Sequence, residues 1–263
     1  MVNDSLDIRP IQAVDIPAIA RLMLSVHGKK TRLNEAYLTW QYVDNPDGEV
    51  IGYNAWDGAV LVAHYACMPV TFTNAVASRV VTHRWLWSLN TATHPDYRGQ
   101  GLFSLLAKQT YDGGLEKGFS AVIGVANAQS AGGFVKKLGF STLGRLSVYL
   151  SVHSTFEMNG LSRQINLSHR LRALKRLNNN PDYILAAYRG IPLVGKVLEA
   201  STHRGPHLYV GLQKPTSLIG FKIPEWLKPS PWVVVYRELG DGPQAGAPEP
   251  PLIQVEMLDS DSI

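Results

Sequence analysis

The stretch HPDYRGQGLFSLL, residues 94–106, places an arginine and two glycines between a strand-like run and a helix-like run. Glycines at 99 and 101 let the chain curl and approach a ligand closely. Amide groups at the start of the following helix have no intrahelical partner and lie at the positive end of the helix dipole. Such a turn suits a diphosphate, to which Arg98 would add a charged contact. Taken alone, the same motif also fits an ordinary glycine-rich turn.

Hydrophobic periodicity on both sides of this turn predicts alternating strands and helices. Asp15 is expected to cap the first helix, and Asp57-Gly58 to join two strands as a tight hairpin. The expected strands cover 5–11, 50–56, 60–73, 80–91, 120–127 and 146–152, and the expected helices cover 15–28, 34–43, 102–117 and 130–138. This order predicts an α/β fold in the broad sense (α+β), with a mixed sheet and helices on its faces.

A second motif follows at a fixed distance: Asn127 and then GFVKKLGF at 133–140. The two motifs together resemble the GNAT (GCN5-related N-acetyltransferase) superfamily, and in particular its sugar N-acyltransferases. In that family the segment R/Q-x-x-G-x-G/A binds the pyrophosphate of coenzyme A. The resemblance covers residues 5–150 in element order and 91–140 in specific motif. It implies a splayed GNAT-like sheet, acetyl-CoA or a longer acyl-CoA as co-substrate, and no metal.

The resemblance also implies a set of CoA-binding residues. The backbone of Thr91, Ala92 and Thr93 is expected to hydrogen-bond the pantetheine arm, which lies along the strand edge. Asn127 and Ser130 are expected to contact the pantetheine or the sulfur end. The residues expected to hold the pyrophosphate are Arg98, Gly99, Gln100, Gly101, Leu102 and Phe103.

Two positions depart from the family pattern. Phe103 stands where the family has glycine or alanine; it still supplies an N–H, and its side chain is expected to face the core. Many family members have a tyrosine four residues before the glycine of the GF pair, where it protonates the leaving thiolate. Here that position is Val135, with Phe134 beside it. Thiols have a pKa of about 8.5, so a thiolate leaving near neutral pH is readily protonated. Its proton could come from water or from the attacking amine.

The expected reaction is direct attack of an amine on the thioester, without a covalent enzyme intermediate. The strand over 80–93 contains no Asp or Glu, and its polar candidates include His83 and Asn90, with His64 on the neighbouring strand. Either histidine could act as a general base, although histidines at such positions are more often structural. The missing carboxylate favours an acceptor whose amine has a low pKa, such as an aminosugar.

The domain prediction is an acyltransferase domain over 1–239, with an acceptor-binding insertion over 153–230. Residues 240–263 are predicted to be a Pro/Gly-rich linker followed by a tail or an edge strand. A basic, amphipathic helix is expected from Arg163 to Arg176, as a solvated face or as a clamp for a phosphorylated acceptor. The expected acceptor-binding residues are Arg170, Lys175 and Tyr183.

Composition and motifs argue against disulfide bonding, membrane insertion and DNA binding. The formal net charge is +4, and Cys67 is the single cysteine, so no intramolecular disulfide can form. The chain shows no secretory signal and no apolar run long enough to span a membrane, so a cytoplasmic location is predicted. DNA binding gets no support from any motif.

Three functions fit these residues. The first is acyl-CoA-dependent N-acyl transfer to a small amine, expected to be a nucleotide-linked aminosugar. The second is acylation of a protein, peptide or tRNA-linked amine, with the basic helix steering an acidic macromolecule. The third is a non-catalytic CoA-binding protein, which the missing tyrosine would permit.

Overall fold

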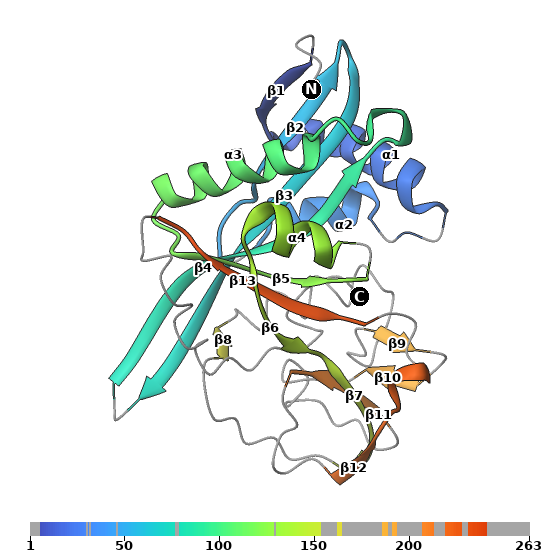
Figure 1. Ribbon diagram of the computed structural model, residues 1–263, viewed down its shortest axis with the longest axis vertical. Coiled ribbons are helices and arrows are strands. Elements are labelled where there is room, and N and C mark those ends of the chain that lie inside the picture. Colours follow the sequence, from blue (N-terminus) through green and yellow to red (C-terminus); the bar gives the residue numbers. More distant parts are fainter. Residues whose placement is uncertain are drawn as a thin grey trace.

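The computed structural model describes residues 6–29, 31, 33–45, 47–76, 79–128, 130–153, 162–164, 186–188, 191–193, 207–212, 219–227 and 231–240. These residues form two β-sheets with helices packed on the larger one (Figure 1). The larger sheet is mostly antiparallel and carries helices on both faces. The mixed α+β fold expected from the sequence is therefore confirmed.

The larger sheet has the strand order β1-β2-β3-β4-β5-β13-β6, with β8 paired to β3. Its strands are β1 (Asp7–Pro10), β2 (Ile51–Asp57), β3 (Val60–Val76), β4 (Arg79–Thr93), β5 (Ala121–Ala126), β6 (Ser141–Arg145), β8 (Ser162–Gln164) and β13 (Val233–Glu238). β2 and β3 are joined at Gly58, which has a φ of 56°, a conformation that glycine adopts without strain. β3 and β4 then form a long antiparallel hairpin.

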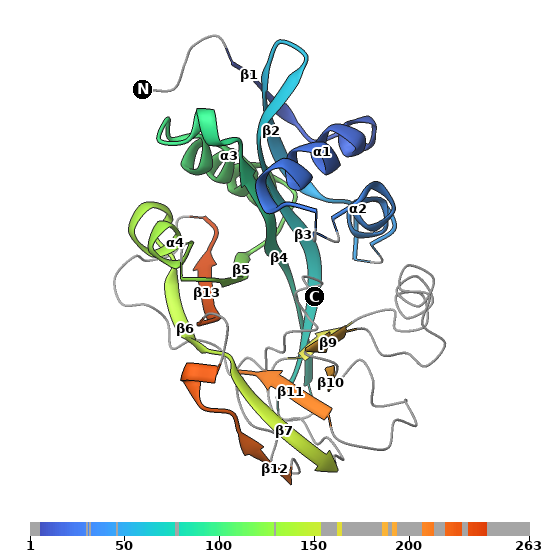
Figure 2. The ribbon, with the colours of Figure 1, turned by 90° about the vertical axis from the view of Figure 1, so that its right-hand side faces the viewer.

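Two pairs of helices cover opposite faces of this sheet (Figure 2). The helices are α1 (Ile16–His27), α2 (Glu35–Tyr42), α3 (Leu102–Glu116) and α4 (Ala131–Leu138), with short 3-10 turns η1 (Ala13–Asp15), η2 (Pro95–Tyr97) and η4 (Glu225–Leu227). One core cluster joins α1 and α2 to the side chains of one face, which include Met68 and Trp87. The other joins α3 and α4 to residues such as Cys67 and Leu86. Residues 67 and 68 point to opposite faces because side chains alternate along a strand.

β4 and β5 separate part-way along their length. They are parallel neighbours over a short pairing that ends at Ser88 and Gly124. Beyond that pair, β4 carries a bulge: Asn90 and Thr91 have no partner on β3, whereas Leu89 pairs with Ala66 and Ala92 with His64. Asn90 has a φ of 51°, a left-handed conformation in which asparagine is enriched. The point where β4 and β5 separate, just beyond Ser88 and Gly124, is termed here the fork. The bulge at Asn90 and Thr91 lies directly beside it.

The smaller sheet is formed by the chain segment between β6 and β13, which are adjacent strands of the larger sheet. It has the order β12-β7-β11-β10-β9 and is built from β7 (Ser147–His153), β9 (Ala186–Tyr188), β10 (Ile191–Leu193), β11 (His207–Gly211) and β12 (Ile219–Lys222). β13 then returns to the larger sheet and lies between β5 and β6. The segment between β6 and β13 therefore covers 146–232 and starts earlier than the predicted 153–230. Leu146, Val148 and Leu208 belong to the core cluster that contains α1 and α2, so the smaller sheet packs on that face.

The sequence predicted a basic helix, three acceptor-binding residues and a C-terminal tail, and the structure tests only the start of the helix. Ser162–Gln164 is a strand paired with β3, so the helix predicted to begin at Arg163 is wrong at its first residues. The tertiary pairing with the long β3 strand overrides the local helical pattern there. The proposed acceptor-binding residues Arg170, Lys175 and Tyr183, and the predicted tail from residue 241 on, lie outside the described residues.

Candidate functional site

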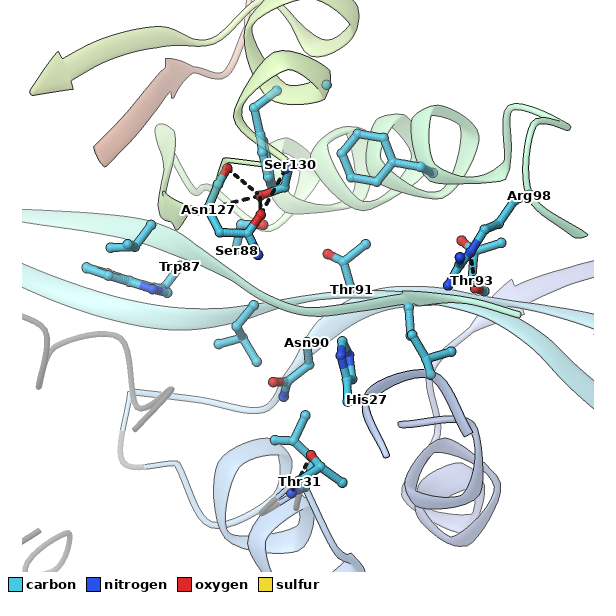
Figure 3. Close-up of a pocket in the computed structure, with 18 of the residues that line it drawn as sticks. His27, Thr31, Trp87, Ser88, Asn90, Thr91, Thr93, Arg98, Asn127 and Ser130 are labelled. Carbon is cyan, nitrogen blue, oxygen red and sulfur yellow. Dashed lines mark hydrogen bonds between the residues drawn. The ribbon is translucent and has the colours of Figure 1, made fainter. Parts of the chain in front are cut away.

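The separation of β4 from β5 opens a cavity of about 870 Å³. The described lining residues come from α1, α2 and the segment between them, from β4 and β5, and from the starts of α3 and α4; they are Val26, His27, Thr31, Leu33, Tyr37, Trp87, Ser88, Leu89, Asn90, Thr91, Ala92, Thr93, Arg98, Phe103, Val125, Asn127, Ser130, Gly133 and Phe134. Figure 3 shows Asn90, His27 and Thr31 on one side of β4, and Thr91, Asn127 and Ser130 on the other. The cavity thus reaches both faces of the sheet.

The glycine turn from Arg98 to Gly101 leads into α3. Gly99 and Gly101 have φ values of 78° and 82°, which glycine adopts without strain. Gly101 is the N-cap of α3 and brings no side chain to cap the helix start. Arg98 lines the cavity, and its Nε donates to the carbonyl oxygen of Thr93 over 3.3 Å. The helix start therefore offers amide N–H groups and a guanidinium near the cavity, a combination that fits a diphosphate.

A tight polar turn follows β5 on the same side. The amide of Ser130 donates to Asn127 Oδ1 over 3.0 Å, and the amide of Asn127 donates to Ser130 Oγ over 3.1 Å. This reciprocal arrangement fixes the start of α4 against the end of the parallel strand. Both side chains line the cavity, where the sequence analysis places the pantetheine arm. The neighbouring edge of β4 contributes Thr91, Ala92 and Thr93 to the same wall.

Aromatic packing accounts for Phe103, the first departure from the family pattern. Phe103 packs edge-on against Phe134, with ring centroids 5.5 Å apart, and also against Tyr65. Its ring thus contacts the α3–α4 core cluster while it also lines the cavity. A β-carbon at Gly133 would lie 3.3 Å from the Phe103 ring, so the small residue on α4 makes room for the phenylalanine. Phe134 is buried, whereas Val135 is 40% exposed and does not line the cavity.

Ser88 carries a hydroxyl to the cavity wall at the fork. Its Oγ lies 2.7 Å from the Tyr65 hydroxyl, which lies 2.6 Å from the Tyr111 hydroxyl. Burial is the main reason that the pKa values of Tyr65 and Tyr111 lie well above 10, so both hydroxyls stay protonated. Burial also raises the pKa of the Cys67 thiol, which is fully buried. Cys67 is therefore a core residue rather than a nucleophile.

His64 lies beneath the cavity rather than in its wall. It is 1% exposed, and burial lowers its pKa to about 3, so the ring is neutral. His64 belongs to a series of hydrogen-bonded side chains, termed here the buried polar network, which consists of Asp15, Asn54, His64, Tyr42, Asn90 and Gln41. Asn90 is the member that lines the cavity. Sequence reasoning missed four members because their elements meet only in the fold.

The other expected catalytic residue on β4, His83, lies away from the fork. It pairs with Phe72 on β3, its ring centroid is 5.6 Å from that of Trp85, and it does not line the cavity. By contrast, His27 at the end of α1 lines the cavity. Partial desolvation and the positive charge of Arg98 lower the pKa of His27 below its usual value. Sequence reasoning missed His27, because its place at the end of α1 is the only local signal.

The cavity wall has a distinctive charge pattern. Its titratable side chains among the described residues are His27, Tyr37 and Arg98, and this part of the wall contains no Asp or Glu. The described residues also contain no cluster of His, Cys, Asp or Glu that could hold a metal ion. In the same part of the chain, no helix has the length and apolar character needed to cross a membrane. A cation entering this part of the cavity would therefore meet positive charge and no compensating carboxylate.

Comparisons with known proteins identify the family to which the chain belongs. Residues 7–143, just over half of the chain, match the acetyltransferase (GNAT) domain. The comparison with curated protein sequences found no match. Among solved structures, the GNAT family N-acetyltransferase YhbS from Escherichia coli, in complex with CoA, is 21% identical with a TM-score of 0.38, over 52% of this chain and 69% of that one.

Two further solved structures are similar. The ribosomal-protein-S18-alanine N-acetyltransferase from Escherichia coli is 16% identical with a TM-score of 0.41, over 57% of this chain and 84% of that one. A conserved protein from Enterococcus faecalis V583 is 14% identical with a TM-score of 0.43, and the match covers 56% of this chain but only 35% of that longer one. The family assignment itself comes from the matched domain: the chain belongs to the GNAT acetyltransferases and is an N-acyltransferase that uses an acyl-CoA as its donor.

Proposed function

We propose that this enzyme transfers an acyl group to a weakly basic amine, of the kind carried by nucleotide-linked aminosugars. The observation that carries the proposal is the described cavity wall, which includes Arg98 and His27 but no Asp or Glu. A lysine-like amine has a pKa of about 10.4, so deprotonating it at pH 7 costs about 4.6 kcal/mol. A sugar amine flanked by electron-withdrawing oxygens has a lower pKa and needs less help from the protein.

The geometry supports direct attack of the amine on the thioester. CoA would lie on the α3–α4 side of the fork, with its diphosphate at the amides that begin α3 at Leu102 and its arm along Thr91–Thr93. Beyond Ser88 one edge of β4 has no strand partner in β5, and the bulge at Asn90 and Thr91 distorts the pairing with β3, so a backbone N–H of this segment is the proposed donor to the oxygen on which negative charge develops. The acyl group would then reach through the fork to the other face.

On the α1–α2 side, His27 is the proposed general base. It lines the cavity on the same side of β4 as Asn90 (Figure 3). Its lowered pKa keeps the ring neutral near pH 7, which is the form that accepts a proton. The departing thiolate takes its proton from water, since His27 takes the one proton that the amine loses and neither Phe134 nor Val135 can donate one. The smaller sheet packs on this same face, which supports the insertion as part of the acceptor site.

A panel of amines tests the proposal. Purified enzyme with acetyl-CoA, or with longer acyl-CoA esters, is offered UDP-glucosamine, free glucosamine, a lysine peptide, a peptide with N-terminal alanine and an aminoacyl-tRNA, and CoA release is measured with a thiol reagent. The proposal expects the highest kcat/KM for the nucleotide-linked aminosugar. Faster turnover of the peptides or the tRNA would replace it with a macromolecular acceptor.

A further inference from the structure

We propose that the buried polar network, anchored at Asp15, turns the carbonyl oxygen of Asn90 into the cavity, where it accepts a hydrogen bond from the acceptor amine. The inference rests on the proposed function in one respect: the amine must bind on the α1–α2 side of β4. It assigns Asn90 to substrate contact, and it makes the remaining members of the network positioning residues.

The anchor of the network has a fixed polarity. Asp15 is 3% exposed and occupies the N-cap position of α1, but its side chain makes no cap bond to that helix. Its Oδ2 instead accepts from the amide of Gln12 over 3.0 Å and from Asn54 Nδ2 over 3.1 Å. Arg9 lies 3.6 Å from the other carboxylate oxygen. Because an ionised carboxylate only accepts, Asn54 must turn its NH₂ group toward Asp15 and its oxygen the other way.

The direction passes next through His64. Asn54 Oδ1 lies 2.7 Å from His64 Nδ1, so Nδ1 must carry the hydrogen. In a neutral imidazole the other nitrogen, Nε2, is then an acceptor. The Tyr42 hydroxyl lies 2.8 Å from Nε2 and must donate to it. Asn54, His64 and Tyr42 are each at most 1% exposed, so water cannot reverse these roles from outside.

The last step orients Asn90. Having donated its only hydrogen, the Tyr42 oxygen can accept, and Asn90 Nδ2 donates to it over 3.0 Å. The second hydrogen of Nδ2 is directed to Gln41 Oε1 over 2.7 Å. Both donors of the amide are thus used within the protein, and within the described chain no hydrogen-bond donor is found for Asn90 Oδ1. The side chain lines the cavity, so it presents an acceptor there.

An acceptor at this position has a chemical use. An oxygen that accepts one N–H of a neutral amine restricts the rotation of that amine, so that its lone pair can be held toward the thioester carbon. Asn90 and Thr91 are adjacent on the bulge, so the same local distortion would hold the amine beside the strand edge that is proposed to stabilise the developing negative charge. A carboxylate at this place would instead favour the ammonium form, which cannot attack.

Nuclear magnetic resonance tests the direction of the network without an acceptor. In ¹⁵N-labelled protein, His64 is expected to be the tautomer with hydrogen on Nδ1 and a bare Nε2. The side-chain NH₂ of Asn90, assigned by its loss in Asn90→Gly, is expected to exchange slowly with water and to shift in Tyr42→Phe. A hydrogen on Nε2 of His64 would overturn the proposal, because Tyr42 would then accept from His64 and the orientation of Asn90 would no longer follow from Asp15.

A double-mutant cycle tests the functional half. Asn90→Gly keeps the left-handed backbone of the bulge but removes the amide. In the wild-type background, Tyr42→Phe is expected to lower kcat/KM for the best amine of the panel by about tenfold, with the dissociation constant of acetyl-CoA unchanged. In the Asn90→Gly background, the same change is expected to alter kcat/KM by less than about twofold, because Tyr42 acts through Asn90.

The control is Tyr236→Phe: Tyr236 is another core tyrosine, and its partly buried hydroxyl donates to Glu238 on β13, outside the network. It is expected to leave kcat/KM unchanged in both backgrounds. Equal losses from Tyr42→Phe with and without the Asn90 side chain would show a purely structural role and overturn the proposal. If no amine of the panel releases CoA, the proposed function fails, whereas the His64 tautomer still decides whether the network has the stated direction.

Discussion

Ser88 of β4 and Gly124 of β5 form the last pair at which the two parallel strands are joined before the fork. A β-carbon at position 124 would lie 3.3 Å from the Ser88 β-carbon and 3.9 Å from Val235 Cγ2. Glycine therefore allows the strands to meet closely at the base of the cavity. The close contact between Ser88 and Gly124 therefore fixes where β4 and β5 separate and where the cavity begins.

Gly124→Ala should destabilise the enzyme by about 1 kcal/mol, because the added methyl overpacks the strand junction. Urea denaturation measures the change. Gly132→Ala in α4 is the matched substitution: its β-carbon meets no atom within 4 Å, and alanine favours a helix. It should stabilise the protein by up to about 1 kcal/mol. Equal effects of the two substitutions would contradict the close contact at the fork.

Gly101→Val should abolish CoA binding. Gly101 has a φ of 82° at the start of α3, and a branched side chain would move the amides away from the diphosphate. In wild-type protein, acetyl-CoA at 100 times its dissociation constant should add about 2.7 kcal/mol of stability, visible as a thermal shift. The variant should show no such shift.

The control for this substitution lies at the other end of α3. Gly118 has a φ of 78° and open space around it, so Gly118→Val introduces the same kind of backbone strain away from the turn. It should lower the melting temperature but keep the acetyl-CoA shift. A retained shift in Gly101→Val would mean that the diphosphate binds elsewhere.

His27→Gln should lower kcat/KM at pH 7 by about a hundredfold, as expected for loss of a general base. In the wild type, kcat/KM should fall as the pH drops through the pKa of His27, which lies below its usual value of about 6.5. The variant should lose this acidic limb. His83→Gln provides the comparison, since His83 is the alternative base on β4. A large loss in His83→Gln with little change in His27→Gln would reverse the assignment.

His64→Asn should change how stability depends on pH. The folded state holds the pKa of His64 at about 3, whereas the unfolded value is about 6.5. Between these values the unfolded state binds a proton that the folded state does not, so the free energy of unfolding falls as the pH falls. The contribution from this one group is at most about 1.4 kcal/mol per pH unit.

Urea titrations at several pH values between 5 and 7 would measure this dependence. The wild type should lose stability faster than His64→Asn as the pH is lowered, since the variant has no imidazole at this position. Parallel curves for the two proteins would show that His64 is not buried as a neutral ring.

Local patterns were enough for much of the fold. The alternation of apolar residues placed the strands and helices from β1 to α4, because periodicity depends only on neighbours in the chain. The turn from Arg98 to Phe103 was recognisable for the same reason: glycine conformation and the exposed amides of a helix start are local properties. The GNAT family followed from two such motifs at their spacing.

The wall of the cavity needed the tertiary structure. Asp15 looked like a helix cap, but packing against β2 turned its carboxylate toward Asn54. The sequence offered His64 and His83 equally as candidate bases. Only the fold shows that His64 is buried beneath the bulge and that His83 lies away from the fork. His27 joins the site because α1 ends beside β4, and contacts between distant segments leave no periodic trace in the sequence.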